Sequence, residues 1–208
     1  MAEQESDIFN MTVRELLTEL KDQSEVIVDL AYASLMYNSE EMSEKVYEIR
    51  DQIEELKYAI RVKTVLAARN KKDAQQMSGI LQVAAAADRI SHSAVDIASL
   101  LQVPAEKRPF ITELIDESDE KIRITRIRPK SDMVGNTIGA LEVESVTGMK
   151  IIALKNRQGW TYDPDYDMKL RAGDDIIVRG TANGFARLEE FTTGALPWEF
   201  PEEGCDEI

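Results

Sequence analysis

The chain has 208 residues, with 39 acidic and 25 basic side chains and a formal net charge of −14. Such a charge repels phosphate backbones, so we expect no nucleic-acid partner. The single cysteine, Cys205, excludes an internal disulfide. No apolar run approaches membrane-spanning length, so we expect a cytoplasmic protein without direct membrane insertion. The length allows two small domains, each with its own core.

Helical periodicity dominates the first half of the chain. Asn10 or Thr12 can cap a first helix, and Ser39 can begin a second. The apolar residues of the second helix alternate by four and three, which is typical of a helical bundle. These residues are Met42, Val46, Ile49, Ile53, Leu56 and Ile60.

A third helix is predicted from about Asp73, which can cap it, to about Leu101. Pro104 and Pro109 end the helical region. The apolar stripe of this third helix is rich in small residues, which let a neighbouring helix approach closely. The stripe comprises Met77, Ile80, Leu81, Ala84, Ala87, Ser91, Ala94, Ala98 and Leu101. Short breaks between the three helices favour an antiparallel bundle.

Acidic side chains recur at helical spacing on two of these helices. The two sets are Asp22, Glu25 and Asp29, and Asp88, His92 and Asp96. Each set shares one helix face, and a carboxylate–imidazole set suits a divalent transition metal. The polar edge of an ordinary amphipathic helix has the same pattern, so both interpretations remain open.

The segment from Ala87 to Ala98, ADRISHSAVDIA, resembles the PhoU helical family. That family carries an acidic-Arg-Ile-x-Asp signature followed by small and apolar residues, and His92 stands here in place of the Asp. PhoU-like proteins pair two three-helix units, whereas this chain is long enough for one. The resemblance implies that acidic residues at comparable positions hold a metal.

Strand and turn signals dominate the second half. Lys121 to Arg128 alternates like a strand, with a bulge or a strand end expected near Thr125. Two apolar runs, Ile151 to Leu154 and Ile176 to Val178, have strand composition. Turn chemistry is found at Gly159, at Asp163 to Asp165 and at Leu170 to Asp174, and a short helix is expected from Gly180 to Phe191.

Five motifs in this half resemble the TrkA-C domain. They are GNTIG at 135–139, IIAL at 151–154, Gly159, Pro164 and LRAGDDIIVRG at 170–180. The family commonly has Arg directly after the IIAL strand, where this chain has Lys155, Asn156 and Arg157. The resemblance implies a small β-rich α/β domain that forms a homodimer. The glycine-rich nucleotide-binding half that accompanies this domain in its family is replaced here by the helical bundle.

Some TrkA-C domains bind cyclic di-AMP in the cleft between subunits, and the resemblance implies a similar small anionic ligand here. Such a ligand needs cationic groups beside an apolar floor. A contiguous stretch offers both, with the residues Ile151, Ile152, Lys155, Asn156 and Arg157. A plain core strand with a charged surface end has the same composition, so that alternative also remains open.

The sequence therefore predicts an α+β fold of two domains: a PhoU-like bundle over 1–108 and a TrkA-C domain over 109–195, before an acidic tail at 196–208. No catalytic constellation is visible, so we expect no enzyme. The combination resembles prokaryotic proteins linked to potassium transport, which implies a regulator of a membrane potassium or cation transporter or channel. Two alternatives are a PhoU-like phosphate-signalling adaptor that binds metal and an assembly subunit whose TrkA-C domain only dimerises.

Overall fold

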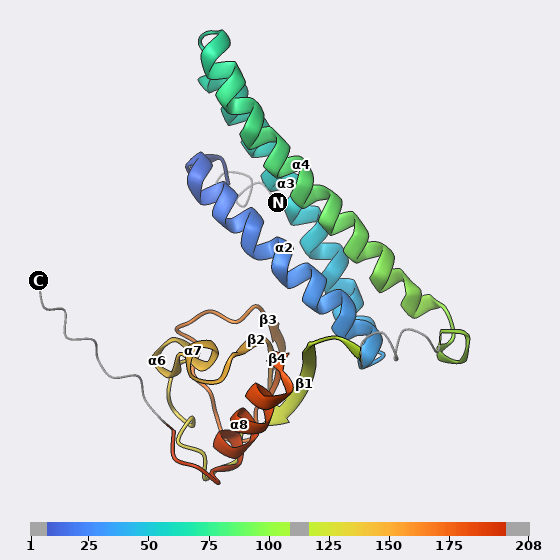
Figure 1. Ribbon diagram of the computed structural model, residues 1–208, viewed down its shortest axis with the longest axis vertical. Coiled ribbons are helices and arrows are strands. Elements are labelled where there is room, and N and C mark those ends of the chain that lie inside the picture. The colour runs from blue at the N-terminus through green and yellow to red at the C-terminus, as the bar shows by residue number, and fades with distance from the viewer. Residues whose placement is uncertain (1–7, 109–116, 199–208) are drawn as a thin grey trace, which may run out of the picture. The chain divides into compact units, whose positions relative to one another are not determined.

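The computed structural model describes residues 8–108 and 117–198 (Figure 1). The chain divides into two compact units, Met1–Pro109 and Phe110–Ile208. In the described residues the first unit is helical and the second combines a four-stranded sheet with short helices, which confirms the predicted α+β fold. Residues 199–208 of the predicted acidic tail lie outside the described part. No described helix has the length and apolar character needed to cross a membrane.

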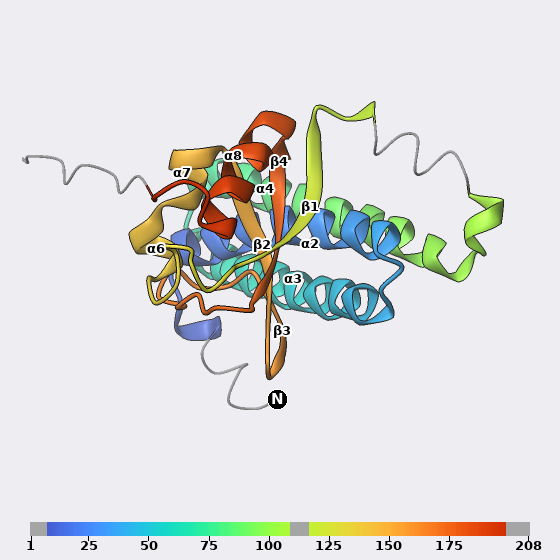
Figure 2. The same cartoon turned by 90° about the horizontal axis from the view of Figure 1, so that it is seen from below.

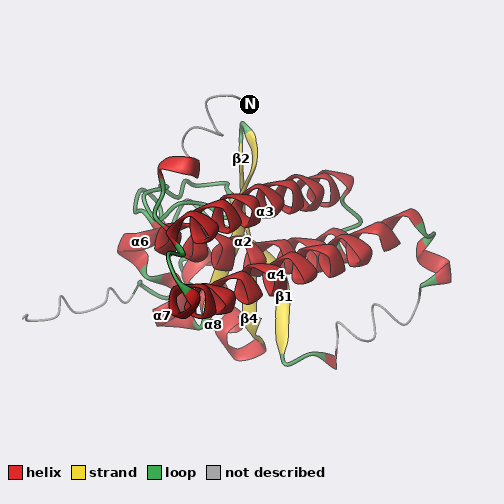
Figure 3. Ribbon diagram, turned by 90° about the horizontal axis from the view of Figure 1, so that it is seen from above, coloured by secondary structure: helices red, strands yellow, loops and turns green. Residues whose placement is uncertain are grey.

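Three long helices form the first unit: α2 (Val13–Met36), α3 (Glu40–Ala67) and α4 (Lys71–Ser99) (Figures 1 and 3). Thr12 caps α2 in a reciprocal capping box with Glu15, and the Ser39 hydroxyl accepts a hydrogen bond from the Met42 amide. Each helix packs against the other two. All six apolar residues of the predicted α3 seam are buried, so the three-helix bundle is confirmed.

Helix α4 differs from the prediction at its start. The N-cap is Asn70, whose Oδ1 accepts hydrogen bonds from the amides of Lys72 and Asp73, at 2.9 and 3.0 Å. The expectation that Asp73 caps the helix is therefore wrong. Asp73 lies one turn inside the helix, where its carboxylate accepts from the Arg69 amide. A capping side chain must precede the first helical residue to reach these amides, and Asn70 does.

The apolar stripe of α4 is buried only along part of its length. Its alanines from Ala84 onward and Ser91 are buried, but Met77, Ile80, Leu81 and Leu101 are only partly buried. The hairpin of α3 and α4 extends beyond the end of α2 in Figure 1, so the stripe has one helical neighbour fewer there. Burial in a bundle thus depends on the length of the neighbouring helix as well as on periodicity.

The sheet of the second unit is antiparallel, with strand order β1-β4-β2-β3. Its strands are β1 (Glu120–Arg126), β2 (Met149–Asn156), β3 (Gly159–Tyr162) and β4 (Asp175–Thr181). Of the two features expected near Thr125, the strand end is confirmed, because β1 ends at Arg126. The bulge is wrong, because β1 pairs with β4 without interruption. The irregularity lies in β2, between Ile151 and Ala153. An extra residue there breaks the strict alternation and lets a run of four consecutive residues be buried.

Three helices pack on one face of this sheet: α6 (Ile138–Leu141), α7 (Val143–Thr147) and α8 (Ala182–Thr193) (Figure 2). Thr137 caps α6, so the GNTIG motif is a turn that opens a short helix, as predicted. The core between helices and sheet includes Leu154, Val178 and Phe191. Trp198, assigned to the tail from the sequence, belongs to this core and packs against the Phe191 ring at a centroid distance of 4.6 Å.

Helix α8 packs so closely against the end of α7 and the start of β2 that one of its positions has no room for a side chain. A Cβ atom added at Gly184 would overlap the backbone oxygen of Thr147 and approach the Met149 Sδ to 3.1 Å. Substitution must therefore push α8 away from α7 and β2, although alanine is intrinsically the better helix former.

We expect Gly184→Ala to destabilise the protein by about 1–3 kcal/mol through this overlap. The matched control, Asn183→Ala, changes the exposed neighbour on the same helix and should stay within about 0.5 kcal/mol of wild type. Urea unfolding of the full chain measures both. A Gly184→Ala protein as stable as wild type would contradict the close packing.

The last pair of the β1–β4 ladder joins Arg126 and Asp175. The Arg126 guanidinium donates two hydrogen bonds to the Asp175 carboxylate, Nε to Oδ1 at 2.6 Å and Nη2 to Oδ2 at 2.8 Å. These bonds favour the charged carboxylate and hold the pKa of Asp175 below its usual value of 3.8. A carboxyl with a lowered pKa in the folded state stabilises the fold above its unfolded pKa, and this contribution is lost as the pH falls through the folded pKa.

We therefore expect Asp175→Asn to be less stable than wild type at neutral pH, and the difference to shrink as the pH falls below 3.8. Urea midpoints at a series of pH values measure it. Asp167→Asn, at an exposed position of the same unit, is the control and should show no such convergence. A stability difference that is independent of pH would rule out the ion pair as its cause.

Candidate functional site

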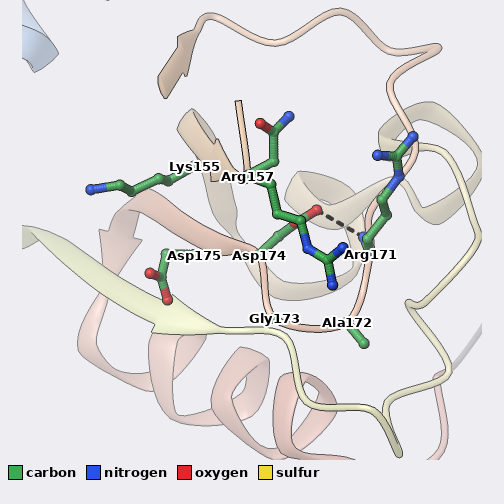
Figure 4. A pocket seen from close by; sticks show the side chains of 8 residues that line it. Lys155, Arg157, Arg171, Ala172, Gly173, Asp174 and Asp175 are labelled. Carbon is green, nitrogen blue, oxygen red and sulfur yellow. Dashed lines mark hydrogen bonds between the residues drawn. The ribbon is translucent and has the colours of Figure 1, made fainter. Parts of the chain in front are cut away.

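A pocket of about 490 Å³ lies where the end of β2 meets the turn that leads into β4 (Figure 4). The β2–β4 pairing places Lys155 opposite Asp175 and so brings the two segments together. Eight residues line the pocket: Lys155, Asn156, Arg157, Arg171, Ala172, Gly173, Asp174 and Asp175. Three of these side chains are cationic and two are acidic.

A tight turn from Arg171 to Asp174 forms one wall. The Asp174 amide donates to the Arg171 carbonyl at 3.1 Å, and Gly173 takes a φ of +93° that favours glycine. The Asp174 carboxylate closes the turn by accepting from the Arg171 amide at 2.9 Å (Figure 4). Two backbone hydrogen bonds to Ile127, one from Gly173 and one to Asp174, tie the turn to the chain after β1. The backbone that carries Arg171 is therefore rigid.

The hairpin between β2 and β3 forms the opposite wall. Asn156 and Gly159 are the last pair of this hairpin, and the Asn156 Oδ1 accepts from the Gln158 amide at 2.7 Å. Arg157 occupies the two-residue loop and extends over the pocket (Figure 4). The Lys155 ammonium lies 5.2 Å from the Trp160 ring centroid, within the range of a cation–π contact.

The charges of the pocket are not balanced within it. Asp174 is buried and engaged by the turn, and Asp175 is engaged by Arg126. Within the described residues, by contrast, the guanidinium groups of Arg157 and Arg171 make no ion pair. In a chain of net charge −14, two arginines and a lysine thus remain available around one hollow. Such a cluster can bind phosphate or carboxylate groups, and arginine can do so with two parallel hydrogen bonds.

The structure brings together part of the predicted ligand site. Lys155, Asn156 and Arg157 line the pocket, whereas Ile151 and Ile152 are buried and do not. Sequence reasoning missed Arg171, which lies fourteen positions after Arg157 along the chain. The signal was the turn at Gly173, but only the β2–β4 register shows that this turn faces the hairpin. The assignment of these residues to a ligand stays a prediction.

The six residues predicted to bind a metal are mostly engaged in other contacts. Lys21 pairs with Asp22 at 3.2 Å and with Glu25 at 2.8 Å. Asp29 is buried, whereas Asp96 is exposed.

The remaining pair, Asp88 and His92, contact other groups of the bundle. Asp88 pairs with Lys57 at 2.7 Å, and His92 Nδ1 lies 2.8 Å from the Asp88 carbonyl, to which it donates. Across the two described ranges, no three His, Cys, Asp or Glu side chains gather as metal ligands would. The metal site also stays a prediction.

Each of the two units contains a region that matches the model of a known protein family. The TrkA-C domain model matches residues 122–193, and the PhoU domain model matches residues 17–101. No curated protein matches the chain significantly.

Several solved structures are similar to parts of the chain. The RCK_C domain dimer of S. agalactiae BusR in complex with c-di-AMP is 22% identical, with 37% of this chain and 95% of that chain covered and a TM-score of 0.35. The RCK C domain of the potassium transport protein KtrA, in complex with cyclic diadenosine monophosphate, is 28% identical, with 41% and 96% covered and a TM-score of 0.33. S. agalactiae BusR in complex with its busAB-promotor DNA is 13% identical, with 83% and 96% covered and a TM-score of 0.34.

The DNA in the last of these structures is bound by BusR and says nothing of this chain. The expectation that this chain binds no nucleic acid therefore stays untested. The PhoU match lies within the first unit and the TrkA-C match lies within the second. The chain therefore carries a PhoU domain followed by a TrkA-C domain.

Proposed function

We propose that the chain is a cytoplasmic, non-enzymatic regulatory subunit of potassium or other cation transport. Its TrkA-C domain forms a homodimer and senses a small anionic ligand, and its PhoU domain docks on a membrane transporter or channel. The observation that carries the proposal is the convergence of Lys155, Arg157 and Arg171 on one pocket of a TrkA-C domain.

Cyclic di-AMP is the first ligand to test, because the TrkA-C resemblance implies it and its chemistry fits the pocket. Its two phosphates each offer oxygens to arginine or lysine, and the three cations come from two separate segments, the end of β2 with its hairpin loop and the turn before β4. Asp174 accepts a hydrogen bond from the backbone amide of Arg171, and the Asp175 carboxylate is paired with the Arg126 guanidinium, so the Arg171 guanidinium remains available to a ligand. The ligand therefore meets a net cationic surface despite the acidity of the chain.

Binding at this place can alter the domain because it bridges two segments. Arg157 belongs to the β2–β3 hairpin and Arg171 to the turn before β4, so one bound anion holds both. A signal reaches the transporter only if two arrangements of the dimer differ in ligand affinity. The ligand then shifts the equilibrium between the two arrangements only by as much as its affinities for them differ.

We expect the full chain to bind cyclic di-AMP with micromolar affinity, at one ligand per dimer, in calorimetric titration at physiological potassium. The Lys155→Ala/Arg157→Ala variant should weaken binding by at least about a hundredfold, because each of the two charge-assisted contacts contributes about 1.5–3 kcal/mol. Lys169→Ala removes an exposed cation of the same unit that does not line the pocket, and it should bind like wild type.

Other outcomes separate the alternatives. A protein that is dimeric but silent to cyclic di-AMP in both calorimetry and thermal shift would be an assembly subunit. A silent protein that retains a transition metal in elemental analysis, lost in Asp88→Asn/Asp96→Asn, would be a metal-binding adaptor of the PhoU type. Either result contradicts the sensor.

Arg171 allows a separate test of the pocket. We expect Arg171→Ala to weaken cyclic di-AMP binding at least tenfold, and Arg171→Lys to recover only part of it, since lysine keeps the charge but loses the planar pair of donors. Calorimetry of both variants beside Lys169→Ala measures this. If Arg171→Ala binds like wild type while Arg157→Ala does not, the site excludes the turn at Gly173.

A further inference from the structure

Helix α4 carries a second apolar seam beside the one that it buries in the bundle. Seven residues spaced alternately by four and three form it, and we call them the outer seam: Gly79, Val83, Ala86, Ile90, Ser93, Ile97 and Leu100. The first six lie within α4, and Leu100 follows its last residue. The buried stripe, by contrast, uses Ala84, Ala87, Ser91, Ala94 and Ala98.

The outer seam is open to solvent at two of its apolar side chains. Val83 is 58% exposed and Ile90 is 44% exposed, while Ile97 and Leu100 are partly covered. A period of seven residues sustained over three repeats is typical of a helix that packs against another helix. A single exposed valine or isoleucine needs no explanation, but a row at this spacing does.

We propose that the outer seam binds the outer seam of a second copy of the chain, with the two α4 helices antiparallel. The sizes of the side chains favour this arrangement, because small and large residues alternate along the seam from Gly79 to Ile97. In the antiparallel register, Ile90 packs over Ser93 of the second copy and Ile97 packs over its Ala86. Val83 then meets its Leu100. A parallel pair would stack small on small and large on large, and would leave voids at Gly79 and Ala86.

The charges beside the seam support the same register. Arg89 and Asp96 are exposed, lie one heptad apart on one side of the seam, and make no ion pair in the described ranges. In the antiparallel register, Arg89 of each copy lies beside Asp96 of the other, so the symmetric pair forms two ion pairs. A parallel pair would instead place each charge beside an alanine of the inner stripe. Flanking charges of this kind commonly set orientation in helix pairs.

The self-association surface belongs to the helical unit, and the TrkA-C dimer of the proposed function belongs to the other unit. The seam is therefore independent of whether the pocket binds a ligand. A chain with two such surfaces can assemble beyond a simple dimer when each surface engages a different copy.

Site-specific cross-linking of the full chain tests the proposal directly. In a Cys205→Ser background, Ser93→Cys places a thiol near the dyad of the antiparallel pair, and a short bismaleimide should join two copies efficiently. Glu44→Cys, on an exposed position of α3, is the control and should give several-fold less cross-linked dimer.

Charge reversal then tests the register. Adding Arg89→Asp to Ser93→Cys should lower cross-linking by about tenfold at low salt, because two pairs change from attraction to repulsion. Adding Asp96→Arg as well restores both pairs in reverse and should restore cross-linking. Circular dichroism confirms that each variant is folded. Equal cross-linking at Ser93→Cys and Glu44→Cys, or a failure of the double reversal to recover what Arg89→Asp loses, would overturn the antiparallel seam.

Discussion

The sheet unit depends on strand β4, which pairs with β1 on one side and β2 on the other. The wall of the pocket that carries Arg171 follows from that double pairing, and the wall that carries Arg157 follows from the β2–β3 hairpin. Asp175, the first residue of β4, holds Arg126 and lies opposite Lys155, and the turn just before it carries Arg171. Because the Gly173 turn is hydrogen-bonded to Ile127, its position is determined by the chain that leaves β1. The pocket is thus a consequence of the ladder and needs no flexible loop.

The same ladder explains how a strongly acidic protein can present a cationic hollow. The acidic residues of the pocket are used internally, one to close a turn and one to join two strands. The arginines remain as donors because the protein contains no described acidic partner for them at this place. Local hydrogen bonding, and not net charge, therefore decides which ion the surface can bind.

Sequence patterns were sufficient for the three long helices, for strands β1, β2 and β4 and for helix α8, because helical periodicity and strand composition are local properties. The α3 seam, the capping role of Thr12 and the GNTIG turn were all predicted in this way. Strand β3 and helix α7 were not predicted, and three further features were missed. The bulge in β2 depends on what both faces of the strand contact, the exposure of Met77 depends on the length of α2, and Arg171 reaches the pocket only through strand register. Each is a property of tertiary packing, which local spacing does not encode.

The central claim is that an anion binds between the β2–β3 hairpin and the Gly173 turn. The most direct measurement is nuclear magnetic resonance of the arginine Nε–H groups in the full chain during titration with cyclic di-AMP. An anion bound at this place should shift the signals of Arg157 and Arg171 together until they saturate, while that of Arg126, already held by Asp175, changes little. Saturating shifts confined to other arginines, or none at all, would contradict it.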